Sequence, residues 1–191
     1  LHPAPAVAGL AAQGQPAFGE NYVQEAAAKT AETAALGLEW HLIGHLQSNK
    51  ADIAARLFDW VQTVDRVKLV TALAKHRDAT RSPLNVLIQV NVDDEASKAG
   101  CRPDEVDALA DAIAIEPSLA LRGLMAIPTP HADVELRRAA LRRMKALVDV
   151  LRSESVLHEL PRRVDELGAA AVVERDPGLG RLEGGGGLLE R

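Results

Sequence analysis

Residues 84–92, LNVLIQVNV, decide the fold class of this 191-residue chain. They are apolar and β-branched for most of their length, and they follow the turn Arg81-Ser82-Pro83, which predicts a strand buried on both faces. Strands of parallel sheets have this character because helices cover the sheet. The stretch therefore indicates a parallel sheet.

Helical and strand-like segments alternate on both sides of this strand. Apolar runs predict further strands at 17–18, 38–44, 58–64 and 119–127, and helical periodicity predicts helices at 22–36, 48–57, 66–79, 103–116 and 134–151. This alternation predicts right-handed βα units, as in a (β/α) barrel of the TIM type or a doubly wound sheet. Because no Gly-rich phosphate turn follows the first strands, the barrel is favoured.

In such a barrel the chemistry lies at the carboxyl ends of the strands. The residues predicted at those ends are Asn21, Gly44-His45, Asp65, Asn91 and Met125–Pro128. We look for the functional site among them.

The pattern is lost after residue 152, apart from one further strand candidate at 169–173. The run Gly184–Gly187 stands in no strand-turn-helix context, so it reads as a linker and not as a phosphate-binding loop. We therefore expect a partial barrel domain over 1–152 and a divergent, disordered tail over 153–191.

Composition excludes several classes of protein. The chain is 47% hydrophobic and 26% charged, with 22 basic against 27 acidic residues and a net charge of −5. This balance, with only 3% aromatic residues, argues against a nucleic-acid or anionic-membrane partner. With a single cysteine, Cys101, and neither a signal peptide nor a membrane-spanning run, we expect a cytoplasmic protein.

Two polar groupings carry weak signals. His41 and His45 have the spacing of metal ligands on a helix, but their segment is predicted as a strand, so packing or hydrogen bonding is favoured and no metal site is expected. Asp93-Asp94-Glu95 reads more readily as a solvated βα loop than as an acid/base pair.

Six strings between residues 14 and 151 closely resemble the pyridoxal phosphate homeostasis protein family, also called the proline synthase co-transcribed family. They are FGENYVQE (18–25), EWHLIGHLQSNK (39–50), TVDR (63–66), NVLIQVN (85–91) with SKAG (97–100), and RGLMAIP (122–128). The resemblance implies a barrel like the N-terminal domain of alanine racemase, which holds pyridoxal phosphate at the carboxyl ends of its strands.

Residue by residue, the resemblance implies that Asn21, Ile43, Gly44 and Met125 contribute to cofactor binding, with Ile43, Gly44 and Met125 beside the ring. At Gly44, the missing side chain would let a planar ring approach the backbone. The family's Schiff-base lysine, in a Ser-Lys-Thr-like string, and its two phosphate-binding strings have no counterpart in this sequence. The strands present therefore correspond to strands two to six of an eight-stranded barrel, and we expect a truncated start and a frame shift near Ser153.

The function implied is binding of pyridoxal phosphate for intracellular homeostasis of vitamin B6 and amino acids, with no catalytic residue assigned. Two alternatives stay open: a pyridoxal phosphate-dependent enzyme of the amino-acid racemase type, and a degenerate chain that no longer binds the cofactor. The partners expected are the small-molecule cofactor and pyridoxal phosphate-dependent apoenzymes, in a monomer or weak dimer.

Overall fold

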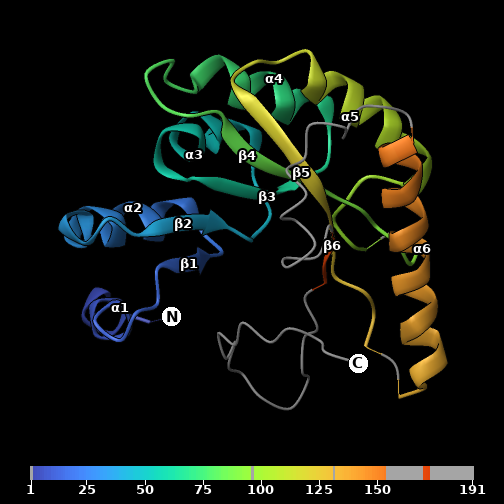
Figure 1. Cartoon of the computed structure of the whole chain (residues 1–191), viewed down its shortest axis with the longest axis horizontal. Coiled ribbons are helices and arrows are strands. Elements are labelled where there is room, and N and C mark those ends of the chain that lie inside the picture. The colour runs from blue at the N-terminus through green and yellow to red at the C-terminus, as the bar shows by residue number, and fades with distance from the viewer. Residues whose placement is uncertain (1, 96, 131, 154–169, 173–191) are drawn as a thin grey trace.

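The computed structural model describes residues 2–95, 97–130, 132–153 and 170–172. Its strands form one parallel sheet in the order β1-β2-β3-β4-β5-β6 (Figure 1). Their bounds are β1 Ala17–Glu20, β2 Glu39–Leu42, β3 Trp60–Val64, β4 Leu84–Gln89, β5 Leu119–Ala126 and β6 Ala170–Val172. The five predicted strands and the candidate at 169–173 are thus confirmed, each within a few residues.

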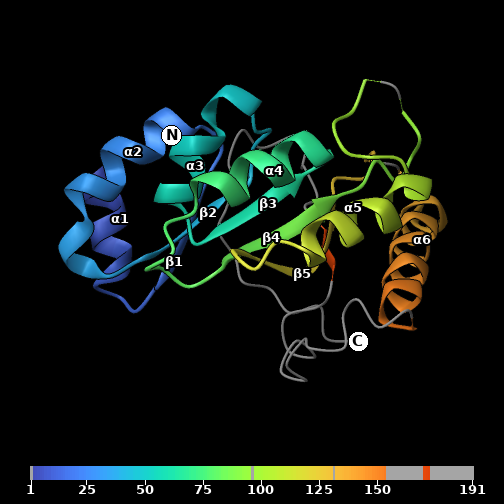
Figure 2. The same cartoon turned by 90° about the horizontal axis from the view of Figure 1, so that it is seen from above.

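Each strand from β1 to β5 is preceded along the chain by an α-helix, in some places with a short 3₁₀ turn beside it. The helices are α1 Ala4–Ala11, α2 Val23–Glu32, α3 Ala51–Leu57, α4 Val67–His76, α5 Val106–Ala114 and α6 Val134–Ser153. Figures 1 and 2 show them following one another around the outer side of the sheet, in the order of the strands. Sequential parallel strands with helices on one side are the arrangement of a (β/α) barrel, and the described part of this one is open because β1 and β6 do not pair.

Helix α1 is missing from the sequence-based prediction. Pro5 lies in its first turn, where the ring costs no hydrogen bond, and Ala4 and Val7 are its buried residues. The helix is short and begins between two prolines, so its apolar periodicity is too brief to be recognised.

The core lies between the outer face of the sheet and the helices. Strand residues such as Leu42, Val86 and Leu124 are fully buried there against helix residues such as Leu73 and Met144. Period two along the strands sends their neighbours to the opposite, inner face of the sheet. That inner face, where it approaches the carboxyl ends of the strands, carries the residues of interest.

Most of the predicted tail, 154–169 and 173–191, lies outside the described residues, as does the proposed frame shift beyond Ser153. Within the described part, no helix is both long and apolar enough to cross a membrane.

Candidate functional site

The carboxyl ends of β1 and β2 bring Asn21, Ile43 and Gly44 together. The two strands are parallel and in register, with Glu20 beside Leu42, so Asn21 follows one strand directly and Ile43 follows the other. Ile43 lies on the inner face, because a Cβ added at Gly19 of β1 would be 3.1 Å from its side chain. Asn21 is partly exposed, and its side-chain amide bonds no other described residue.

Gly44 is required by the neighbouring backbone. A Cβ at this position would lie 2.1 Å from the carbonyl oxygen of Asn21 and 2.7 Å from its Cα. The sequence-based explanation, that the absent side chain leaves room for a ring, is therefore not needed to account for this glycine. Close approach of two strand ends accounts for it.

Met125, the fourth predicted residue, belongs to β5 and is 1% exposed. Its strand neighbours Leu124 and Ala126 belong to the core under the helices, and Met125 does not, so its side chain lies on the inner face. In register beside it is Gln89, the last residue of β4. We call the inner-face positions Ile43, Gln89 and Met125, together with Asn21, the strand-end site.

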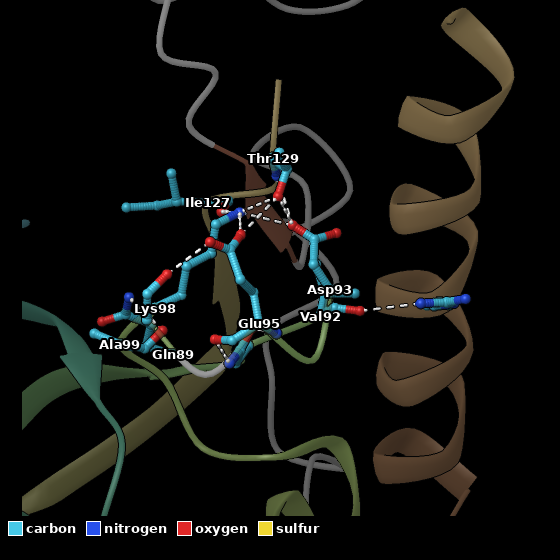
Figure 3. Close-up of polar contacts among 11 residues, drawn as sticks. Gln89, Val92, Asp93, Glu95, Lys98, Ala99, Ile127 and Thr129 are labelled. Atoms are coloured by element: carbon cyan, nitrogen blue, oxygen red, sulfur yellow. Dashed lines mark hydrogen bonds and ion pairs between the residues drawn. The ribbon is translucent and has the colours of Figure 1, made fainter. Parts of the chain in front are cut away.

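A network of hydrogen bonds ties the loops after β4 and β5 together (Figure 3). The Lys98 Nζ donates to Asp93 Oδ2 at 2.8 Å, to Thr129 Oγ1 at 2.5 Å and to the carbonyl oxygen of Ile127 at 3.3 Å. Thr129 donates its backbone N–H and its hydroxyl to Asp93 Oδ2. Glu95 lies at the edge of the network, with Oε2 3.2 Å from Thr129 Oγ1 and 3.6 Å from Lys98 Nζ.

The predicted solvated loop at Asp93-Asp94-Glu95 holds for Asp94 and Glu95, which are exposed, whereas Asp93 is partly buried within this network. Burial raises the pKa of the Asp93 carboxyl, but the hydrogen bonds from Lys98 and Thr129 outweigh burial and hold that pKa below its usual value. Hydrogen bonds from Ser97 and Thr129 likewise lower the pKa of Glu95. Asp93 and Glu95 are therefore ionised anchors at neutral pH, and they are not poised to exchange protons.

The other predicted strand-end residues serve local structure. Asn91 binds the backbone of Glu95 through both ends of its amide, at 2.8 and 3.2 Å. Asp65 accepts from Arg66, which also donates to the carbonyl oxygen of Leu46 at 3.0 Å, and His45 lies 3.7 Å from Asp65.

The two histidines do not form a metal site. The His41 ring stacks on Trp60 with centroids 5.3 Å apart and bonds Glu39 and Gln62, whereas His45 is exposed. Across the described residues, no group of three or more His, Cys, Asp or Glu side chains gathers as metal ligands. Cys101 is buried, and burial raises the pKa of its thiol to about 12, so it is not a nucleophile.

The strand-end site fits one part of pyridoxal phosphate. Ile43 and Met125 are apolar residues of the inner face, the first partly and the second fully buried, and Gln89 Oε1 is a buried acceptor without a donor among the described residues. A flat ring with hydrogen-bonding groups on its edge matches this combination. Non-covalent contact with the ring is therefore compatible with the residues present.

The six lysines of the sequence do not provide a Schiff-base amine in this structure. Lys98 is the lysine nearest the strand ends, and its ammonium group is held by Asp93, Thr129 and Ile127. Lys29 is paired with Glu20 on the outer side of the sheet, and the remaining four lie on helices or in the 3₁₀ turn Ser48–Lys50. No lysine of this structure is therefore assigned a Schiff base with pyridoxal phosphate.

Sequence reasoning did not assign Gln89 or Thr129 to any site. A signal for Gln89 was present, because the glutamine follows directly on the apolar run Val86-Leu87-Ile88. A buried polar side chain in such a strand needs a partner. Thr129 carries no comparable signal, since only the fold brings it beside Asp93.

Comparison with known proteins supports the resemblance. Residues 2–164 match the family described as alanine racemase, N-terminal domain. The chain is 51% identical over 146 residues to the pyridoxal phosphate homeostasis protein of Pseudomonas aeruginosa, covering 76% of this chain and 64% of that protein. It is 52% identical over 134 residues to the protein of that name from Escherichia coli K12, covering 69% of this chain and 57% of that protein.

Solved structures agree on the fold. PipY of Synechococcus elongatus PCC7942 superposes with a TM-score of 0.77 without PLP and 0.75 with PLP bound, at 32% and 29% identity, covering 91% of this chain and 85% of PipY in both cases. An alanine racemase of Clostridium difficile shares the fold alone, with a TM-score of 0.67 at 12% identity over 81% of this chain and 42% of that one. The family match over residues 2–164 and the similarity to PipY both agree with the observed parallel sheet. The chain therefore belongs to the alanine racemase N-terminal domain family, in which it is similar to the pyridoxal phosphate homeostasis proteins.

Proposed function

We propose that this chain binds pyridoxal phosphate and serves the intracellular homeostasis of vitamin B6 and amino acids. The observation that carries the proposal is the likeness to PipY with PLP bound, which extends over 91% of this chain. The relatives named for pyridoxal phosphate homeostasis, at about half identity, support the same role. Because the chain spans 64% and 57% of those two relatives, the role concerns the part of such a protein that this chain builds.

In this proposal Ile43, which follows β2, and Met125, in β5, supply apolar side chains to the cofactor site from two strands that β3 and β4 separate. Met125 is buried and Ile43 is partly buried, so both keep water from the inner face. Asn21 offers a free amide beside them, and Gly44 keeps the ends of β1 and β2 close enough for Asn21 and Ile43 to act together. The bound cofactor supplies a reactive aldehyde, which a homeostasis protein keeps from other amines.

We propose binding in preference to turnover, and the network around Lys98 supports this, because it occupies the ionisable side chains at the ends of β4 and β5 among the described residues. The partners proposed are the cofactor itself and the apoenzymes that use it, in the cytoplasm, with the chain as a monomer or weak dimer. The likeness to alanine racemase concerns the fold, and nothing in the strand-end site favours racemisation over binding.

Equilibrium dialysis of the purified chain against pyridoxal phosphate tests the proposal. We expect saturable binding at one site, weakened at least tenfold by Ile43→Asp, because a carboxylate replaces apolar surface at the ring. Val67→Asp, at a half-exposed position on α4, is the matched control and leaves the affinity within twofold of wild type. Absence of saturable binding in a chain that unfolds cooperatively would favour the degenerate alternative and refute the proposal.

A further inference from the structure

Gln89 is one of three residues with a buried side-chain polar atom that lacks a hydrogen-bond partner in the described part of the chain. The other two atoms are Glu25 Oε2 on α2 and Trp60 Nε1 at the start of β3. Of the three, only Gln89 lies at the carboxyl end of a strand, where it is in register with Met125. The residue is 5% exposed, so bulk water does not reach the oxygen.

The orientation of the Gln89 amide follows from its surroundings. Its Nε2 donates to the carbonyl oxygen of Ala99 at 3.4 Å (Figure 3). In the reversed orientation Oε1 would face that carbonyl, and two acceptors would oppose each other. The oxygen is therefore the end of the amide that is turned away from Ala99.

The loop that sets this orientation is bound tightly to the end of β4. Cys101 N–H donates to the Gln89 carbonyl, and Asn91 N–H donates to the Cys101 carbonyl, each at 2.8 Å. Gly100, with φ of +119°, makes the approach possible, since a Cβ there would lie 2.6 Å from the Asn91 nitrogen. Lys98 secures the same loop to the end of β5. The carbonyl of Ala99, and with it the amide of Gln89, is thus held in a preorganised position.

A buried acceptor without a donor costs free energy, and folded proteins rarely keep one unless it has a use. On the β5 side the in-register neighbour of Gln89 is the apolar Met125, so this side offers no second polar group to a buried water, which needs two or more. A ligand that packs against Met125 and carries a donor group would supply the missing hydrogen-bond partner of Gln89 Oε1.

We propose that Gln89 is a further ligand-contacting residue of the strand-end site, whose Oε1 accepts a hydrogen bond from an O–H or N–H donor on the edge of the pyridoxal phosphate ring. This inference rests on the proposed function. It explains why a glutamine occupies the last position of an apolar strand and why the Ser97–Cys101 loop is anchored at both of its ends.

The test compares Gln89→Leu with Gln62→Leu. Both substitutions remove an amide from the inner face, but Gln62 is already satisfied by His41 at 2.9 Å. For Gln89→Leu we expect an unfolding midpoint in urea close to that of wild type, because removal of the unpaired acceptor offsets loss of the 3.4 Å hydrogen bond to the Ala99 carbonyl, and a Kd for pyridoxal phosphate raised about tenfold. For Gln62→Leu we expect a lower midpoint and a Kd within twofold of wild type.

A ligand that lacks the 3-hydroxyl, 3-deoxypyridoxal phosphate, identifies the donor. If the hydroxyl is the donor, Gln89→Leu and wild type bind this ligand equally, and if the ring nitrogen is the donor the tenfold difference remains; either result supports the role of Gln89. Gln89→Leu with wild-type affinity for pyridoxal phosphate would overturn the inference and leave the proposed function intact. A wild-type chain that does not bind pyridoxal phosphate would overturn both.

Discussion

Replacing Gly44 by alanine is expected to destabilise the fold without any ligand present. The added Cβ would lie 2.1 Å from the carbonyl oxygen of Asn21, about 1.3 Å inside the shortest ordinary contact. The clashing atoms are backbone on both sides, so no side-chain rotation relieves them, and the ends of β1 and β2 must separate.

Overpacking of this kind costs about 2–3 kcal/mol. With a urea m value of roughly 2 kcal/mol/M, the unfolding midpoint of Gly44→Ala falls by about 1 M. Circular dichroism in a urea gradient, without pyridoxal phosphate, measures the shift.

Gly9→Ala is the matched control. Gly9 lies inside α1, nothing comes within 4 Å of the Cβ that the substitution adds, and alanine is favoured over glycine in a helix by about 0.5–1 kcal/mol. We expect its midpoint to stay level or rise. A Gly44→Ala midpoint equal to that of wild type would refute the backbone argument, and a loss of cofactor affinity at unchanged stability would restore the explanation that this glycine leaves room for a ring.

Three further outcomes are expected. Arg77→Ala loses about 2–4 kcal/mol in urea unfolding, because the buried guanidinium donates to the carbonyls of Ala55 and Phe58 and these would be left unpaired. Asp93→Asn is less stable than wild type at pH 7, and the difference narrows as the pH falls below about 4, because a carboxyl whose pKa is lowered in the folded state contributes stability only while it is ionised; a difference in stability that does not narrow with falling pH would contradict this origin. Cys101 reacts with iodoacetamide only on unfolding, and rapid labelling of the native chain, followed by mass spectrometry, would show that the thiol is not buried.

The order of strands and helices could be predicted because it depends on local patterns. The apolar run at 84–92 and the helical periodicity of Val134–Leu151 each reflect burial of one element's own surface. The end of β4 was predicted too late, because the apolar residues Val90 and Val92 continue the pattern of the strand. The strand ends at Gln89, and Val90 forms an isolated bridge with Cys101. Helix α1 was not predicted, because a short alanine-rich segment directly after Pro3 has little hydrophobic periodicity.

The sequence by itself determined the fold class, the family and the order of the strands, because these follow from hydrophobic periodicity and from contiguous strings of residues. Only the tertiary structure decided what those positions do. It placed the backbone of Asn21 against Gly44, joined Asp93 and Lys98 to Thr129, and left Gln89 with a buried, unpaired oxygen beside Met125. Each of these contacts joins residues from separate segments, and their distances depend on how neighbouring strands are registered and how their loops return.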